Sequence, residues 1–582
     1  MTDIIDVLIC GAGPVGCFFA NLMEQAGHNF RIIDNTTFES RRGQSRALLL
    51  TARSLEILHD RGLSGDILRA ALILHGFRLY TPTKQAAQVE MGQLDTPFPH
   101  ITTIPQWKLE EALISNLKTK IERPATVLSY VQESDHVVAK VQHGDDKDNI
   151  EEIRARYLVG SDGVHSAVRK GIEGWTFNGV VVNAPFAIAD VELEGENPPS
   201  DRHLSFVNSP KGSFGFIPMA KPDGEGIIYR ILFNVERIET YSDDGSHITQ
   251  GIKTTHDFTE KEMEEMLTER ASPFKFEIKK TLWVSKFGVN ERKANGFRRG
   301  RAFIIGDAAH CHSPAGGQGM NLGLQDAYNL AWKISAILNN TVKDPEQLLE
   351  SYHLERVEQV DKTIEATGKA LRTQVTSGIM SDFMRTFVLP VIVSIPSIQG
   401  MAGHVVQQLY VTIPTKSPLL AMKTNSTIIE PGKFFTDTGV IYPKNTIDFG
   451  PNTIKQILQK SYRHVALLIW NGCGSEEASE PFWKLLEVYQ KCVRPVVIAS
   501  TIYVERYRVP PYGANSADGQ TGFWADPRGS LGKKLGIPDK HAGIILLRPD
   551  MYVAFSADYK GNSPLPLEPL KAYLDQHFKS AS

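Results

Sequence analysis

The chain has 582 residues, with 63 Lys and Arg against 66 Asp and Glu, so its formal net charge is −3. Hydrophobic residues make up 42% and charged residues 22%, a globular composition that excludes a disordered, collagenous or coiled-coil chain. The near-neutral balance gives no electrostatic reason to expect nucleic acid or an anionic membrane as a partner. The five cysteines lack CxxC or zinc-ligand spacing, so we expect no disulfide framework and a reducing, cytoplasmic compartment.

The first predicted unit is a strand, a turn, a helix and a second strand. Residues 4–10 form an apolar run of strand length, and a glycine-rich turn follows. Apolar side chains then recur at helical spacing from Val15 to Ala26, and Gly27 fits the end of that helix. Residues 29–34 have the composition of a strand and end in Asp34. The pattern predicts a βαβ unit.

The turn of this unit reads Gly11-Ala-Gly13-Pro-Val-Gly16, a GxGxxG fingerprint. Gly11 permits a tight turn, Gly13 lets the backbone approach a pyrophosphate, and Gly16 lets the helix pack on the strand. The phosphates then meet N–H groups at the positive end of the helix. Asp34 lies 18 residues beyond Gly16, close to the spacing of about 20 for an acid that binds the ribose. The unit predicts a dinucleotide but does not separate FAD from NAD.

Further along the chain the periodicity changes. Residues 176–290 alternate with period two, which predicts a sheet-rich second unit. Residues 301–306 form another buried strand, and a long helical pattern follows to about residue 338. Residues 386–415 contain no Asp, Glu, Lys or Arg, but three prolines and two glycines interrupt them. Because a spanning helix needs about 20 consecutive apolar residues, we expect helix packing or a subunit contact there, not stable membrane insertion, and a homodimer stays open.

Two later segments distinguish the two cofactors. Residues 157–169 read YLVGSDGVHSAVR and contain Asp162, whereas residues 300–327 read GRAFIIGDAAHCHSPAGGQGMNLGLQDA and contain Asp307. These segments resemble the DG and GD motifs of the single-component FAD-dependent aromatic hydroxylases, the family of p-hydroxybenzoate hydroxylase and phenol hydroxylase. The first fingerprint also matches that family, so the three motifs together are far more specific than any one of them.

The resemblance implies where FAD binds. Asp307 accepts hydrogen bonds from the ribityl chain, and Asp162 serves both cofactor and nicotinamide. The helix after the GD loop points its N-terminal N–H groups at the flavin pyrimidine, where negative charge develops. Arg46 and Gln106 match FAD-contacting residues, although a surface salt bridge and a helix cap are the alternatives. The expected cofactor residues are Gly11, Gly13, Gly16, Asp34, Arg46, Gln106, Asp162, Asp307, Gly317, Met320 and Asn321.

The resemblance also implies the reaction. NADPH or NADH docks transiently as co-substrate, because the chain has no second strand–GxGxxG–helix unit. A flavin C4a-hydroperoxide formed with O2 then hydroxylates a phenolic or aromatic compound, for which a specialised metabolite is one candidate. Baeyer–Villiger oxygenation or epoxidation is the first alternative. A non-catalytic flavin-binding interaction protein is the second.

Substrate contacts are expected from Arg230, on a strand resembling one that carries a substrate-facing arginine, and from the carbonyl of Pro314. Both are the expected catalytic residues, whereas His203 and Tyr229 are weaker candidates for a general base. His310 and His312 lie within the GD segment without a carboxylate or cysteine at ligand spacing. We therefore expect no metal site.

The last part of the chain resembles the thioredoxin-like domain of the phenol hydroxylase branch. Arg548-Pro-Asp550 looks like the hairpin of that branch, and Cys473 and Cys492 are too far apart in sequence for a CxxC pair. The expected fold is α/β: a Rossmann-like FAD-binding domain with an inserted β-sheet substrate domain, plus a C-terminal thioredoxin-like domain. The expected limits are 1–175 and 291–345 for FAD binding, 176–290 for substrate, 346–420 for a helical connection and 421–582 for the last domain.

Overall fold

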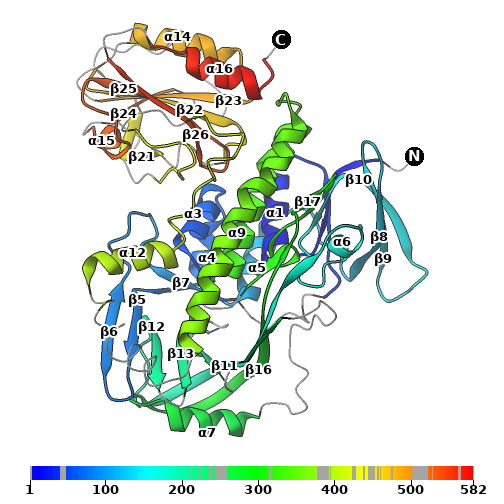
Figure 1. Cartoon of the computed structure of the whole chain (residues 1–582), viewed down its shortest axis with the longest axis vertical. Helices are drawn as coiled ribbons and strands as arrows, with labels where there is room; N and C mark the ends of the chain where they lie inside the picture. The colour runs from blue at the N-terminus through cyan, green and yellow to red at the C-terminus, as the bar shows by residue number, and fades with distance from the viewer. Residues whose placement is uncertain are drawn as a thin grey trace.

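The computed structural model describes residues 3–37, 39, 47–209, 212–221, 224–234, 239–242, 259–312, 317–375, 392, 395–422, 428–436, 440–443, 452–454, 458, 460–473, 476–500, 522–526, 529–561 and 565–580. Three large sheets organise the described residues, and the C-terminal sheet forms a lobe at one end of the molecule (Figure 1). The described helices include none that is long and apolar enough to cross a bilayer.

The first sheet has the parallel core that the βαβ pattern predicts. Strand β1 (Ile5–Cys10) lies between β2 (Phe30–Ile33) and β10 (Ile150–Gly160), and all three run parallel. Beyond β10, β18 (Ala302–Ile304) is also parallel and β17 (Arg298–Arg299) is antiparallel. The hairpin β8 (Ala125–Gln132) and β9 (Val137–His143) extends from β10. Val7, Leu8 and Ile9 are fully buried, as an apolar strand covered on both faces should be.

Three helices pack against one another beside this sheet. They are α1 (Pro14–Gln25), α5 (Gln106–Ser115) and α8 (Gly319–Leu338), and α1 contacts both of the others. The smaller helices nearby are α3 (Ala52–Asp60), α4 (Ser64–Ala70), α6 (Ala167–Lys170) and the 3-10 turn η1 (Gly306–Ala308). A short sheet of β3 (Leu49–Leu50), β7 (Ile101–Thr103) and β4 (Leu72–Leu74) contacts the second sheet.

The second sheet is mostly antiparallel, as the period-two pattern predicts. Its order is β19-β16-β11-β14-β13-β12-β5-β6, and β15 also pairs with β11. Two strands, β5 (Gly76–Tyr80) and β6 (Gln85–Glu90), come from sequence that precedes the alternating region, and no local pattern indicated their place. The others are β11 (Phe177–Asn197), β12 (His203–Ser209), β13 (Gly212–Ala220), β14 (Ile227–Asn234), β15 (Glu239–Ser242), β16 (Lys275–Ala294) and β19 (His310–Cys311), with helix α7 (Glu260–Arg270) beside them.

Two further helices connect these parts. The long helix α9 (Pro345–Val375) runs from the C-terminal lobe, alongside α8, to β13 of the second sheet (Figure 1). Helix α12 (Pro396–Val406) lies within the uncharged stretch, of which the structure describes Ile392 and residues 395–415. Its Gln407 accepts a hydrogen bond from the N–H of Ala52 at 2.6 Å, so the helix end is anchored on α3.

The C-terminal lobe is a mixed sheet in the order β21-β20-β24-β23-β22-β25-β26. Strands β22 to β24 are parallel and β25 and β26 are antiparallel, which agrees with the predicted thioredoxin-like fold. The fold class is therefore confirmed, whereas the domain limits stay a prediction. The bounds are β20 (Val440–Pro443), β21 (Asn452–Thr453), β22 (His464–Asn471), α14 (Glu476–Glu487), β23 (Val493–Ser500), β24 (Gly522–Asp526), α15 (Ser530–Lys534), β25 (His541–Leu547), β26 (Val553–Lys560) and α16 (Glu568–His577).

Candidate functional site

One large cavity, of about 1070 Å³, joins the first sheet to the second. It begins at the glycine turn after β1 and ends against the second sheet and α12. Most of the described residues that the sequence assigns to the cofactor line it: Gly11, Gly13, Asp34, Gln106, Asp162, Asp307, Gly317 and Met320. Segments far apart in the sequence therefore meet at one site.

The glycine turn has no room for side chains. Gly11 has a φ of +99°, and an added Cβ would lie 2.4 Å from the carbonyl oxygen of Ser161. At Gly16 an added Cβ would lie 1.9 Å from the carbonyl oxygen of Gly11. Gly13 is the N-cap of α1, and the first turn of that helix contains no acidic residue. The start of α1, behind this turn, therefore suits a pyrophosphate.

Asp34 lies at the end of β2, where the fingerprint places the ribose-binding acid. Its Oδ2 accepts a hydrogen bond from the N–H of Ala12 at 2.6 Å. Its Oδ1 accepts hydrogen bonds from the N–H and hydroxyl of Thr36, at 2.9 and 2.6 Å. The carboxylate therefore fastens the glycine turn to the end of β2, and its ribose contact stays a prediction.

Asp162 has one carboxylate oxygen paired and one without a partner. Oδ2 accepts hydrogen bonds from the N–H groups of Ala167 and Val168, at 2.7 and 3.2 Å, at the start of α6. Oδ1 is buried and has no hydrogen-bond partner. Desolvation raises the pKa of this carboxyl above its ordinary value, against the lowering effect of its hydrogen bonds. This oxygen, at the cavity wall, can accept a hydrogen bond from a bound ligand.

The GD loop and the start of α8 form the next part of the cavity wall. Asp307 is exposed to the cavity, whereas Gln318, the N-cap of α8, is buried and its Oε1 has no hydrogen-bond partner. Gly317 has a φ of +63°. No acidic side chain occurs in the first turn of α8, so its terminal N–H groups present positive potential to the cavity. Sequence reasoning missed Gln318, although it stands between two glycines of the motif.

Asn321 does not line the cavity but fixes the start of α8. Its Nδ2 donates to the carbonyl oxygens of Leu49 and Gly317, at 2.8 and 2.9 Å, and its Oδ1 accepts from the N–H of Thr51 at 3.0 Å. Gln106 is the first residue of α5 and donates from Nε2 to Glu110 at 3.0 Å. Both residues are therefore held in place at or beside the wall.

The far part of the cavity is apolar. Helices α9 and α12 contribute Thr367 and Val405, and the second sheet contributes the opposite wall. Asn208 and Arg230 are the polar side chains of the wall from the sheet, and its apolar side chains are Phe77, Leu79, Ile188, Leu204, Phe206, Ile217 and Leu232. No sequence pattern had indicated α12 as part of the site.

Arg230, the predicted substrate contact, lines this part of the cavity and is 1% exposed. It stands opposite Asp190 in the β11–β14 register. The two side chains form a bidentate pair, with Nε–Oδ1 and Nη2–Oδ2 both at 2.7 Å. The ring of Trp283 lies 5.6 Å from its Cζ. The guanidinium is thus fixed in orientation and balanced in charge.

The other predicted residues are distributed as follows. Arg46 and Pro314 lie outside the described residues. Tyr229 donates its hydroxyl to the carbonyl of Pro199 at 3.0 Å, and burial raises its pKa to about 12. His203 binds Glu90 at 2.9 Å. Neither Tyr229 nor His203 lines the cavity, which agrees with leaving both out of the predicted site.

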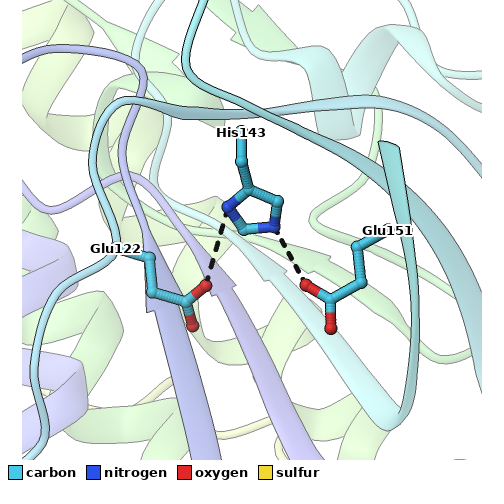
Figure 2. A group of neighbouring side chains, drawn as sticks. All are labelled: Glu122, His143 and Glu151. Atoms are coloured by element: carbon cyan, nitrogen blue, oxygen red, sulfur yellow. Dashed lines mark hydrogen bonds and ion pairs between the residues drawn. The ribbon is translucent and has the colours of Figure 1, made fainter. Parts of the chain in front are cut away.

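The sequence predicts no metal ligand. The carboxylate of Asp326, 16 residues after His310 in the sequence, lies 2.6 Å from Nε2 of His310. Among the described residues, Glu122, His143 and Glu151 also come close enough to hold an ion (Figure 2). Arg31 donates to all four oxygens of the two glutamates at 2.7 Å, so a guanidinium already occupies this position.

The cysteines are thiols, not nucleophiles. All five are free and buried. Burial, together with nearby Asp307, raises the pKa of Cys311 in the cavity wall to about 12. Burial and Asp539 raise the pKa of Cys473 in the C-terminal lobe to about 11. Neither side chain is a thiolate at neutral pH, so neither has the lowered pKa that redox catalysis needs.

The chain is similar to known flavoproteins in sequence and in fold. Residues 4–367 match the family described as FAD binding domain. A flavin-dependent monooxygenase from Mycobacteroides abscessus is 31% identical over 369 residues, which cover 60% of this chain and 71% of the relative. Rifampicin monooxygenase from Streptomyces venezuelae is 31% identical over 358 residues, covering 61% and 68%. OxyS anhydrotetracycline hydroxylase from Streptomyces rimosus shares the fold, with a TM-score of 0.68 at 24% identity over 100% of each chain.

The residues present fit FAD. Gly11 and Gly13 of the glycine turn line the cavity, and a buried carboxylate oxygen of Asp162 lacks a donor. The helix that follows the GD loop offers positive potential where a reduced flavin carries negative charge. The matched family region, residues 4–367, includes all of these features. The chain therefore belongs to the FAD binding domain family, and it is an FAD-dependent monooxygenase.

Proposed function

We propose that this enzyme hydroxylates a large, mostly apolar phenolic or other aromatic compound, with NADPH or NADH as reductant and O2 as oxygen donor. The observation that carries the proposal is the single cavity of about 1070 Å³ that runs from the glycine turn to the apolar wall of the second sheet. Pockets for drug-sized ligands measure about 300–1000 Å³. A cavity of this size suits FAD together with an aromatic ring system.

The residues of the wall support specific roles. When bound, reduced FAD supplies the activation of O2. Asp307 and the N-terminal N–H groups of α8 hold the cofactor, and the apolar side chains opposite exclude water from the reacting atoms. Arg230, oriented by Asp190, is the proposed contact to the substrate hydroxyl or its phenolate. The backbone carbonyl of Pro314 is the second proposed contact to the substrate.

The size of the cavity also suggests the substrate class. Relatives named for rifampicin and 6-methylpretetramide act on multi-ring compounds, and pentachlorophenol 4-monooxygenase on a single ring. The apolar wall from five strands offers few polar partners, which supports a fused aromatic compound over a small polar phenol. We propose a polycyclic specialised metabolite as substrate.

A graded panel tests this proposal. The holoenzyme is incubated with NADPH or NADH and phenols of one, two, three and four fused rings, and both hydroxylated product and hydrogen peroxide are measured. We expect the ratio of product to peroxide to rise with ring number. A ratio that peaks at simple phenol would contradict the proposed class. Product structures separate hydroxylation from ring-oxygen insertion and epoxidation.

The proposal also covers the cellular compartment and the assembly of the enzyme. We propose a reducing, cytoplasmic compartment, which the five free and buried thiols support.

We also propose a homodimer contact at α12, because Ile395 and Met401 are 43% and 67% exposed there. Light scattering of the wild type and of Met401→Glu tests the contact: a dimer that becomes a monomer is expected, and an unchanged mass would exclude it.

A further inference from the structure

A cluster of fully buried charges lies where the C-terminal lobe meets α8 and α9. Arg548, in the turn between β25 and β26, donates to both oxygens of Glu355 on α9, at 2.7 and 2.9 Å. It also donates from Nε to Asp550 at 2.9 Å. Lys333 of α8 donates to Glu355 at 2.8 Å. All four side chains are 0% exposed, and two positive charges balance two negative ones.

Neutral side chains of α8 complete this cluster. Trp332 Nε1 donates to Asp550 at 3.0 Å, and Asn329 Nδ2 donates to Asp550 and Glu355 at 3.1 and 2.8 Å. Each buried oxygen of Glu355 and Asp550 therefore has a donor. A buried ion pair with every group satisfied specifies one geometry, and loss of one partner leaves an uncompensated charge.

A second buried cluster begins one residue further along α9. Arg356 donates from Nε to Oδ1 of Asp326 on α8 at 2.7 Å. The other oxygen of Asp326 accepts from the N–H of Gly306 at 3.1 Å and contacts Nε2 of His310 at 2.6 Å. Gly306 directly precedes Asp307, the exposed acid of the GD loop. Asp326 thus fixes both ends of the short segment that presents Asp307 to the cavity.

Helix α9 connects the two clusters. Glu355 and Arg356 are consecutive, and Tyr352, one turn earlier, donates its hydroxyl to the carbonyl of Ile304 at 2.9 Å. Burial alone would raise the pKa of Asp326, but His310 and Arg356 outweigh it and lower that pKa, so the carboxylate stays charged. We call the series Asp550, Arg548, Glu355, Arg356 and Asp326 the ionic ladder. It consists of two buried sets of paired charges, one at the C-terminal lobe and one at the GD loop, which the backbone of α9 joins at Glu355 and Arg356.

We propose that the C-terminal lobe, through the ionic ladder, holds the GD loop in its cofactor-binding geometry, so that Arg548 and Asp550 are positioning residues for FAD. The lobe then acts on the flavin site without contacting it and without redox chemistry of its own. Coupling of this kind is reciprocal: FAD bound at the cavity stabilises the hairpin between β25 and β26 to the same extent.

The test measures how firmly the holoenzyme keeps FAD. Dissociation is followed by the recovery of free flavin fluorescence after dilution, for the wild type, Arg548→Met and Arg548→Lys. We expect Arg548→Met to raise the FAD dissociation constant roughly tenfold, within the range of measured couplings between sites. Arg548→Lys should fall between the two, because an ammonium keeps the charge but loses the bidentate geometry.

A matched control separates this role from general loss of stability. Arg494 is also an almost fully buried arginine of the C-terminal sheet, on β23, which β22 separates from β25. We expect Arg494→Met to change FAD affinity by less than about twofold even where it lowers the unfolding temperature. Equal loss of FAD in Arg494→Met and Arg548→Met would overturn the proposal.

Hydrogen exchange gives a readout that does not depend on activity. In the holoenzyme, we expect Arg548→Met to speed exchange in the peptide 304–310, which contains the Gly306 amide bound by Asp326. Unchanged exchange and unchanged FAD affinity in a folded Arg548→Met would show that the ladder is structural only. Should Arg548→Met not fold, the isosteric Asp550→Asn decides the question by the same two measurements and the same criteria.

Discussion

The first turn of helix α8 and the rest of that helix differ in how their polar groups are paired. At its start, near Gly319 and Met320, the helix has no acidic side chain in its first turn and faces the cavity. Further along the helix, beyond the first turn, Asp326 and Lys333 are charged, fully buried and paired with groups from α9. The cofactor end leaves backbone groups open for a ligand, whereas the packed end satisfies every charge within the protein. One helix thus combines a binding site, whose polar groups are available to a ligand, with a scaffold, whose charged groups are paired within the protein.

The largest effect on stability is expected from removing a partner of the buried charges that pack against α8. Glu355→Gln leaves Arg548 and Lys333 without their shared counter-charge, and removal of one partner from a buried ion pair costs about 3–5 kcal/mol. We expect the free energy of unfolding at pH 7 to fall by that amount. Urea titration followed by circular dichroism measures it, and Glu365→Gln, an exposed glutamate further along α9, serves as the control.

The same variant has a defined pH signature. Burial would raise the pKa of Glu355, but the charges of Arg548 and Lys333 outweigh it and lower that pKa well below the ordinary value. The folded pKa is therefore below the unfolded one. The stabilisation is fully present above the unfolded value of about 4.3 and is lost as pH falls through the folded pKa. Wild-type stability should decline more steeply than that of Glu355→Gln below about pH 4.3, and parallel curves would exclude this origin.

The next largest effect is expected at the cofactor end, on FAD affinity. Asp307→Ala removes the exposed carboxylate of the GD loop. A hydrogen bond to a charged group contributes about 1.5–3 kcal/mol, so FAD affinity should fall roughly 10- to 150-fold. The ratio of flavin to protein absorbance after gel filtration measures it, and Asp148→Ala, an exposed aspartate in the β9–β10 turn, is the control. A full complement of FAD in Asp307→Ala would mean that the GD motif is wrongly assigned.

A smaller effect is expected at the glycine turn. Gly16→Ala places a Cβ 1.9 Å from the carbonyl oxygen of Gly11, so the backbone must shift. Overpacking of this kind costs about 1–3 kcal/mol. We expect a lower unfolding temperature and reduced FAD content, measured by scanning calorimetry and absorbance. Gly92→Ala, where an added Cβ meets nothing within 4 Å, should resemble the wild type.

The smallest effect sharpens the account of the apolar wall. Leu232→Phe places a larger side chain in the wall and so reduces the space in the cavity without changing its polarity. A change of about one methylene in a pocket alters selectivity by roughly tenfold or more. We expect kcat/KM for the largest accepted ring system to fall by about tenfold relative to simple phenol. An unchanged ratio would show that the substrate does not reach this wall.

Local sequence patterns predicted the elements of this fold well. The strand predicted over residues 4–10 is observed as Ile5–Cys10, and the strand predicted over residues 29–34 as Phe30–Ile33. The glycine motif lies between β1 and α1 as expected. These features depend on periodicity and turn chemistry within a few residues, and such short-range constraints are visible in one sequence.

Contacts between distant segments could not be predicted in this way. Arg230 finds Asp190 because β11 and β14 align in one register. Arg548 finds Glu355, 193 residues earlier, because a hairpin of one sheet packs on a helix of another unit. The sequence marked Arg548-Pro-Asp550 only as a turn, and it gave no indication that β5 and β6 join the second sheet. Such pairings depend on tertiary geometry, which no local pattern encodes.

The most direct test of the central claim is oxygen transfer with isotopically labelled O2. Holoenzyme, NADPH or NADH and a multi-ring phenol are incubated under ¹⁸O2, and the product is analysed by mass spectrometry. The account predicts a product with one added oxygen that carries the label, together with one NAD(P)H oxidised for each product formed. NAD(P)H consumption that yields only hydrogen peroxide across the whole panel, or product oxygen derived from water, would contradict it.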